Sequence, residues 1–153
     1  MNVQLFGILN YTPDSFYDGG KNNHEHTVLQ AAQNLLDNGA TFIDIGAEAT
    51  NPFVKNLTAE EEIKRLSFVL PLLLHEFPDK ISLDTYHPET LRWALRHGRV
   101  ILNDVSGLYD PVMVKLVANN NLICIAGHIP KAANGLPVAS HSFQLDDFDS
   151  IVD

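Results

Sequence analysis

Polar side chains recur in this sequence directly after short apolar runs, where several of them could share one ligand. Asn10, Asp84 and Asn103 each close such a run. A carboxylate and an amide together offer two acceptors and an amide donor pair, which suits the edge of a flat heterocycle with an amino group and ring N–H groups. The side-chain oxygen of Asn10 is a hard ligand of the kind that Mg²⁺ prefers. Gly19 and Gly20 follow in the next loop, where the backbone could approach a phosphate closely.

Covalent catalysis and zinc chemistry have no recognisable pattern in the sequence. The single cysteine, Cys124, lies in an apolar run, so we expect a buried structural thiol and no intrachain disulfide. Neither a G-x-S-x-G motif nor a P-loop occurs. The seven histidines show no zinc-ligand spacing, so we expect surface histidines. His128 differs because it follows the fifth run, where it either lines a site or bonds within its loop.

The elements that must position these residues are short, nearly continuous apolar runs that alternate with segments of helical period. Such runs are typical of parallel strands with both faces buried, and the alternation predicts a parallel sheet with right-handed crossovers. We therefore expect an α/β fold, either an open doubly wound sheet or part of a (β/α)₈ barrel, which typically needs about 250 residues. The predicted strands are Gln4–Asn10, Thr41–Gly46, Lys80–Asp84, Arg99–Asp104 and Leu122–Gly127.

The segments between these runs carry local helix signals. Thr58 and Glu61 have the spacing of a capping box, and Pro71 predicts a kink or break in the helix that follows them. An apolar stripe from Val28 to Leu36 predicts a helix that ends at Gly39. Pro88 opens a further helix, which Gly98 stops. The last two predicted helices are one over Asp110–Asn119 and one that starts over Asp146–Asp153.

In parallel α/β folds, ligands bind at the edge where the strands end, because the following loops converge there. The polar residues after all five predicted strands would meet at that edge. One carboxylate in such a place could simply cap a helix. Polar groups after every strand favour a site instead.

The composition is that of a soluble globular protein with an acidic surface. Hydrophobic residues make up 45% and charged residues 19%, and 10 Lys and Arg against 19 Asp and Glu give a net charge of −9. This charge argues against nucleic acid and anionic membranes as partners, because both need a basic patch. No signal peptide or membrane span is recognisable, so we expect a cytoplasmic protein with one domain over residues 1–153.

Four segments resemble the signatures of the dihydropteroate synthase family of pterin-binding enzymes. Gly7–Gly20 is similar to the first signature almost throughout, and Ile43–Thr50 to the second. Ile81–Tyr86 and Leu102–Gly107 are similar to the next two, and the spacings are intact over essentially the whole chain. The resemblance implies the N-terminal part of a TIM-type (β/α)₈ barrel, with about five parallel βα units.

The resemblance also implies a reaction of folate biosynthesis. Dihydropterin pyrophosphate condenses with p-aminobenzoate, and pyrophosphate leaves with Mg²⁺. Asp84 and Asn103 would bind the pterin, and two loops that carry Asp18 and Thr50 would enclose p-aminobenzoate. The resemblance assigns catalytic roles to Asp18, Asp44 and Thr50, a metal contact to Asn10, and substrate contacts to Ile8, Phe16, Thr50, Asp84, Asn103 and Val105.

The sequence departs from the family pattern in three ways. Asn51 stands where Arg is usual, which removes a charge-assisted contact worth about 1.5–3 kcal/mol. Gly127 stands where the family usually has Met against the pterin, and the sixth to eighth strands with their charged residues are absent. We therefore expect the isolated chain to be inactive. It is either a fragment, a piece completed by a homo-oligomer or a complementing C-terminal chain, or a homologue that has lost catalysis. Two alternatives stay open: a non-catalytic pterin-binding or interaction module, and a pterin-dependent methyltransferase-like domain, which the long first signature disfavours.

Overall fold

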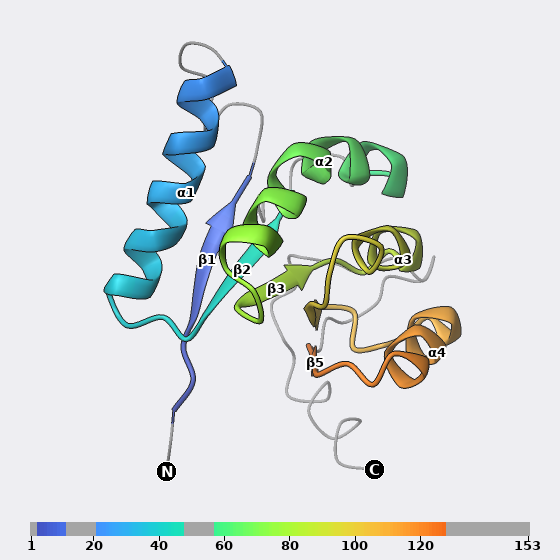
Figure 1. Ribbon diagram of the computed structural model, residues 1–153. Helices are drawn as coiled ribbons and strands as arrows, with labels where there is room; N and C mark the ends of the chain where they lie inside the picture. The colour runs from blue at the N-terminus through green and yellow to red at the C-terminus, as the bar shows by residue number, and fades with distance from the viewer. Residues whose placement is uncertain (1–2, 12–20, 48–56, 128–153) are drawn as a thin grey trace, which may run out of the picture.

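A computed structural model describes residues 3–11, 21–47 and 57–127 of the chain. Strands and helices alternate along these residues (Figure 1). Each predicted strand is present, with its ends within two residues of the prediction. The predicted fifth helix lies outside the described residues. The elements are β1 (Phe6–Asn10), α1 (Lys21–Asp37), β2 (Phe42–Gly46), α2 (Ala59–Glu76), β3 (Ile81–Asp84), α3 (Pro88–Ala94), β4 (Ile101–Asp104), α4 (Pro111–Asn119) and β5 (Cys124–Ala126).

The strand order decides between the two predicted architectures. All five strands are parallel and lie in the order β1-β2-β3-β4-β5. A doubly wound sheet reverses its order at a switch point, whereas a barrel adds its strands in sequence. The helices follow one another around one side of the sheet, as Figure 1 shows. The fold is therefore a partial TIM-type barrel, as predicted.

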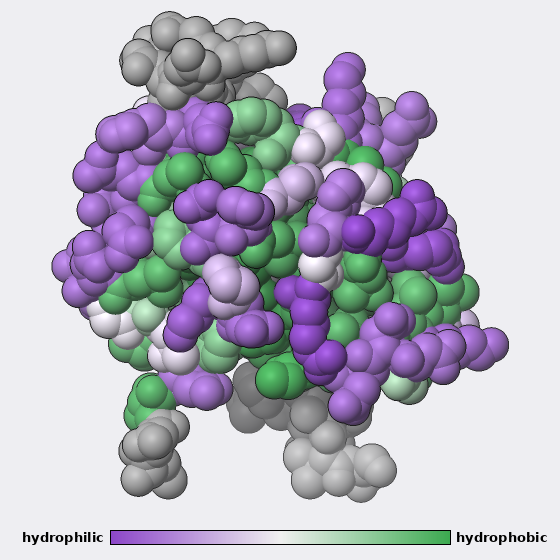
Figure 2. All heavy atoms as spheres, in the orientation of Figure 1, coloured by the Kyte–Doolittle hydropathy of each residue, from purple (hydrophilic) through white to green (hydrophobic). Residues whose placement is uncertain are grey.

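The hydrophobic core lies between the helices and the face of the sheet that they cover. Ile43, Ile45, Leu83 and Leu102 on this outer face are completely buried. The helices contribute fully buried side chains to the same cluster: Val28, Ala32, Leu66, Val69, Leu70, Leu73, Leu91, Ala94 and Met113. Polar side chains cover the outside of the helices and apolar ones fill the spaces between them (Figure 2). Within the described residues, no helix is both long enough and apolar enough to cross a membrane.

The inner face of the sheet is exposed in part, although the apolar runs are typical of strands with both faces buried. Ile8 on β1 is 67% exposed, and Ile123, just before β5, is 63% exposed. These side chains point away from the helices, because their neighbours Leu9 and Cys124 pack into the core. A closed barrel covers such residues with the strands opposite, whereas the five described strands form one sheet in which β1 and β5 are the edges.

Most helix ends follow the local signals, but α3 ends at Ala94, before the predicted stop at Gly98. α1 ends shortly before Gly39, whose φ of 98° lies in the left-handed region that favours glycine. The Thr58 hydroxyl accepts from the backbone N–H of Glu61 (3.3 Å), and the Glu61 carboxylate accepts from the backbone N–H of Thr58 (2.9 Å). Asp110 caps α4 by accepting from the N–H of Val112 at 2.7 Å. The predicted capping box is therefore confirmed.

A kink or a break was predicted at Pro71, and the break is absent. α2 is continuous from Ala59 to Glu76, with Pro71 inside it. Proline in a helix interior costs about 3 kcal/mol, because it removes one hydrogen bond and crowds the preceding turn. Leu66, Leu70 and Leu73 on the same helix are fully buried. Each such side chain contributes about 1.5–3 kcal/mol, which together outweighs the cost of the proline.

Replacing the Thr58 cap tests how much this local signal contributes to stability. We expect Thr58→Ala to lower the free energy of unfolding by about 1 kcal/mol, because the N–H of Glu61 loses its acceptor. Thr58→Ser keeps a hydroxyl and is the matched control, with a change of only a few tenths. Urea denaturation followed by circular dichroism measures both. Equal losses for the two variants would show that the hydroxyl is not what stabilises α2.

Candidate functional site

Inward-facing side chains form two rows across the sheet near the carboxyl ends of the strands. Ile8, Asp44 and Ser82 are register partners in the first row. Side chains alternate between the two faces of a strand, so the second row lies two residues further along each strand. It contains Asn10 opposite Gly46 and Asp84 opposite Asn103. The sheet thus gathers the polar residues that the sequence places at separate strand ends.

Asp44 is the centre of a hydrogen-bonded cluster in this region. Its Oδ1 accepts from the Ser82 hydroxyl at 2.6 Å, and its Oδ2 accepts from the Asn103 side-chain amide at 2.9 Å. Asp44 is 8% exposed, and Ser82 is completely buried. A buried carboxylate is costly unless donors face it, and these two donors supply that compensation. Three neighbouring strands, β2, β3 and β4, are joined in this way.

Sequence reasoning missed Ser82. A signal for it was present: Ser82 lies two residues before Asp84, so the two share a face of β3. A small hydroxyl residue between Ile81 and Leu83 interrupts an otherwise apolar strand.

Asp84 and Asn103 lie side by side at the ends of β3 and β4, as the sequence predicted. Both side chains are only partly buried, and their backbones are register partners. Gly46 lies beside Asp84 on the neighbouring strand. Because glycine has no side chain, it leaves vacant the position of a Cβ atom, which would lie 3.5 Å from Oδ2 of Asp84. The two side chains therefore lie close enough together on the inner face to contact the same ligand.

Apolar residues flank the polar cluster. Ile8 lies opposite Asp44 on the first strand and is largely exposed. Val105 follows β4 and is partly buried. The backbone of Gly127 lies against Val105, so a Cβ at position 127 would lie 2.8 Å from the Val105 Cα. A larger residue at position 127, such as the Met usual in the resembled family, would require this contact to shift.

The metal contact that the resemblance assigns to Asn10 is not accompanied by a cluster of metal-binding side chains in the described residues. Asn10 is exposed at the end of β1. Within the described residues, no three His, Cys, Asp or Glu side chains come together to hold a metal ion. His26, His75 and His97 are exposed, as predicted for surface histidines. His87 corrects that prediction, because it is partly buried and its Nε2 lies 3.0 Å from the Leu57 carbonyl oxygen.

Hydrogen bonds on the helix side hold the strand ends in place. The Thr85 hydroxyl donates to the buried Glu62 carboxylate at 2.8 Å, which ties the residue after Asp84 to α2. Arg65 on the same helix donates to the Ala47 carbonyl oxygen at 3.0 Å, just after β2. These contacts anchor the ends of the two strands that carry Asp44 and Asp84.

Asp104 is a structural residue of the loop after β4. Its carboxylate accepts from the backbone N–H groups of Ser106 (2.8 Å) and Leu108 (3.1 Å). The side chain is 1% exposed, so it takes no part in the open cluster. Cys124 is partly rather than fully buried. Burial raises the pKa of its thiol, and the Asp104 carboxylate adds to the rise, so the thiol is a poor nucleophile.

Several predicted site residues lie outside the described part of the chain. Their roles stay predictions from the resemblance. They are Phe16, Asp18, Thr50, Asn51 and His128.

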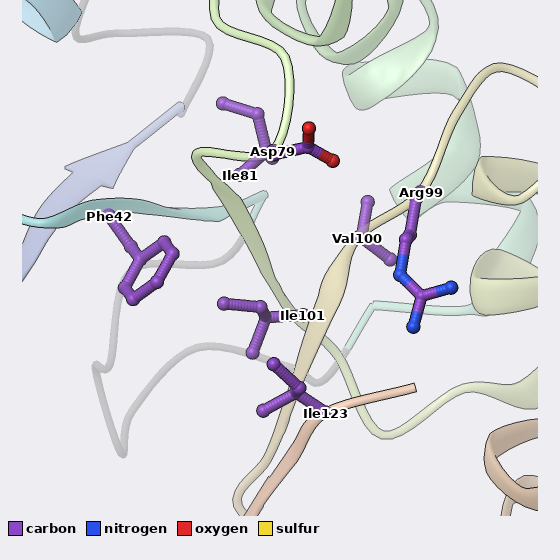
Figure 3. Close-up of a pocket in the computed structure, with 7 residues that line it drawn as sticks. All are labelled: Phe42, Asp79, Ile81, Arg99, Val100, Ile101 and Ile123. Atoms are coloured by element: carbon purple, nitrogen blue, oxygen red, sulfur yellow. The ribbon is translucent and has the colours of Figure 1, made fainter. Parts of the chain in front are cut away.

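A separate cavity of about 120 Å³ lies at the opposite, amino-terminal end of the sheet. Phe42, Ile101 and Ile123 converge in it, as Figure 3 shows. Asp79 and Arg99 lie at its border. This cavity is mostly apolar, and it forms part of the uncovered inner face rather than of the polar cluster.

Comparisons with known proteins point to one family. The family model described as "Pterin binding enzyme" matches residues 6–147. A dihydropteroate synthase of Streptococcus pyogenes is 42% identical over 131 residues, which are 85% of this chain and 49% of that protein. The chain spans about half the length of the curated dihydropteroate synthases that it matches.

Solved structures of dihydropteroate synthases share the fold. The enzyme from Anaplasma phagocytophilum with bound 6-hydroxymethylpterin-monophosphate matches with a TM-score of 0.76 and 36% identity, over 97% of this chain and 56% of that one. The Xanthomonas albilineans enzyme with 4-aminobenzoic acid matches with a TM-score of 0.72 and 34% identity, over 83% of this chain and 46% of that one.

Proposed function

Because the chain belongs to the pterin-binding enzyme family, we propose that it forms the pterin-binding part of a dihydropteroate synthase. The reaction joins dihydropterin pyrophosphate to p-aminobenzoate. The single observation that carries this proposal is the polar cluster at the ends of β2, β3 and β4. There the Asp84 carboxylate lies beside the Asn103 amide, which the Asp44 carboxylate orients.

Asp84 and Asn103 would bind the edge of the pterin. The Asp84 carboxylate accepts hydrogen bonds from amino or ring N–H groups, and the Asn103 side chain adds an acceptor and its remaining amide hydrogen. Ile8 lies next to this cluster with most of its surface exposed, so it can pack on the flat ring. Val105 would take the same role on the β4 side. These residues suit a flat ligand whose edge carries polar groups and whose faces are apolar.

Asn10 would contact the pyrophosphate and its metal ion. Its side chain is exposed at the end of β1, and its oxygen is a hard ligand that fits Mg²⁺. One neutral ligand does not retain Mg²⁺ by itself, so the ion would arrive with the pyrophosphate as part of the substrate. There the ion would neutralise charge on the leaving pyrophosphate.

In the proposed reaction, the amine nitrogen of p-aminobenzoate attacks the pterin methylene carbon. The new C–N bond forms as the C–O bond to pyrophosphate breaks, and the amine then loses a proton. Asp44 supports the cluster from β2 and is the one proposed catalytic residue within the described chain. Asp18, Phe16 and Thr50 would enclose p-aminobenzoate, as the resemblance to the family implies.

We also propose that residues 1–153 form one incomplete barrel domain that works in the cytoplasm. Such a domain would pair with the remaining strands of a barrel, whether these belong to the same polypeptide, to a second copy in a homo-oligomer or to a complementing C-terminal chain. A non-catalytic pterin-binding module remains the second candidate. One observation favours it: the pterin-binding groups come together within the described residues without further strands.

Replacing Asp84 tests the proposed pterin site. We expect Asp84→Asn to weaken binding of 6-hydroxymethylpterin about tenfold or more, because an amide presents a donor where the ring edge also presents donors. Isothermal titration calorimetry on the folded chain measures the affinity. Asp79→Asn is the matched control, because Asp79 is an exposed carboxylate just before the same strand and asparagine tolerates its φ of 61°. Equal affinity in wild type and Asp84→Asn would exclude the proposed role.

A further inference from the structure

We propose that Ser82 and Asp44 are positioning residues that hold the Asn103 amide in one orientation, with its carbonyl oxygen turned toward the ligand. The inference deepens the proposed function and rests on it for the identity of the ligand. Its structural part concerns only Ser82, Asp44 and Asn103. It therefore has a test of its own that does not need any ligand.

The orientation follows from what a carboxylate can do. Both oxygens of Asp44 are acceptors, and Asn103 lies with its side-chain nitrogen 2.9 Å from Oδ2. A carboxylate has no hydrogen to donate, so only the NH₂ end of the amide can face it favourably. An amide turned by 180° would place two acceptors against each other at a position that is nearly closed to water. Asp44 therefore selects one of the two amide orientations.

Ser82 holds Asp44 in the rotamer that makes this selection. Its hydroxyl donates to Oδ1 at 2.6 Å, between residues that are direct register partners on β2 and β3. Asn103 reaches the other oxygen from β4, across the intervening strand. Without the hydroxyl, Oδ1 would lose this donor at a buried position and the carboxylate could rotate. Ser82 is completely buried, so its effect on a ligand must pass through Asp44 and Asn103.

The consequence is a choice of ligand edge. With the amide fixed, Asp84 and the oxygen of Asn103 are two neighbouring acceptors at the ends of β3 and β4. Two acceptors select a heterocycle edge with two donors, such as an exocyclic amine beside a ring N–H. A ring with a carbonyl in place of the amine would place acceptor against acceptor and be rejected. Ser82 would thus determine selectivity for aminopteridines over oxopteridines without touching either.

The first test uses the ligand-free chain. In ¹⁵N-labelled protein, the side-chain amide signals of Asn103 are identified by their loss in Asn103→Asp. We expect one of the two hydrogens to be shifted by the charged acceptor and to exchange with water at least tenfold more slowly than in exposed asparagines such as Asn34. Ser82→Ala should remove most of that protection. Unprotected Asn103 hydrogens in the wild type would overturn the proposal, even if Ser82→Ala fails to fold.

The second test measures selectivity by calorimetry, with 6-hydroxymethylpterin and its 2-oxo counterpart, 6-hydroxymethyllumazine. We expect the wild type to prefer the pterin, and Ser82→Ala to reduce the ratio of the two affinities about tenfold. Ser67→Ala is the matched control, because Ser67 is an exposed serine on α2 whose hydroxyl bonds only locally, to the Lys64 carbonyl oxygen. An equal loss for both ligands, with the ratio unchanged, would mean that Ser82 is merely structural. A protected Asn103 amide in a chain that binds no pterin would leave the positioning role intact and remove the proposed function.

Discussion

A polypeptide of these 153 residues, assayed alone, is expected to form no measurable dihydropteroate. The departing pyrophosphate gains negative charge as the C–O bond breaks, and that charge must be stabilised by cations or donors aimed at it. Lys80 and Arg99 precede β3 and β4, so they lie at the edge of the sheet opposite the polar cluster. The guanidinium of Arg65 donates to a backbone carbonyl oxygen. The net charge of −9 adds no favourable field for an anionic substrate.

Pyrophosphate release from dihydropterin pyrophosphate in the presence of p-aminobenzoate measures this expectation. The control adds a polypeptide that carries the second half of the Streptococcus pyogenes relative, of which this chain covers 49%. We expect release to appear only in the mixture, if the two parts assemble. Turnover by the pure 153-residue chain at ordinary enzyme rates, roughly 1–1,000 per second, would contradict the expectation.

The same polypeptide is expected to associate with itself, or to be only marginally stable. Its inner face exposes Ile8 (67%) and Ile123 (63%), beside the apolar cavity that Phe42 and Ile101 line. β1 and β5 are the edges of the described sheet, and an edge strand offers its unpaired backbone groups to another chain. An exposed apolar face of this kind is uncommon in monomers.

Sedimentation velocity combined with hydrogen exchange measures both outcomes. Ile123→Lys should weaken association about tenfold or more, because covering an isoleucine contributes about 1.5–3 kcal/mol and a charge there opposes contact. Val112→Lys on the outer surface of α4 is the matched control, since Val112 is also exposed (42%) but lies on the helix side. A stable monomer with strong amide protection along both β1 and β5 would show that these edges are already covered.

Local sequence signals were enough to place the elements and most of the described site. The apolar runs located all five strands, and Thr58 with Glu61 located the start of α2. Asp84 and Asn103 were identified as partners because each closes a parallel strand, and parallel strands end at one edge. The strands and the start of α2 depend on residues close together in the chain, so the sequence alone determines them. The pairing of Asp84 with Asn103 also requires that β3 lie beside β4.

Other features depend on residues far apart in the chain, and only the tertiary structure decided them. The unbroken helix around Pro71 depends on the burial of Leu66, Leu70 and Leu73 against the sheet, which outweighs the local preference of proline. His87 is partly buried, and its ring nitrogen lies at hydrogen-bond distance from the carbonyl oxygen of Leu57, 30 residues earlier.

The site itself shows the same division between local and long-range determinants. The sequence identified Asp44 as a site residue but not its partners, because Ser82 and Asn103 are 38 and 59 residues away from it. Strand order was equally undetermined, since the same alternation of strands and helices fits both a doubly wound sheet and a barrel. The exposed inner face followed from that order. Apolar residues such as Ile8 and Ile123 indicate that a face is meant to be covered, but only the arrangement of strands in space shows whether anything covers it.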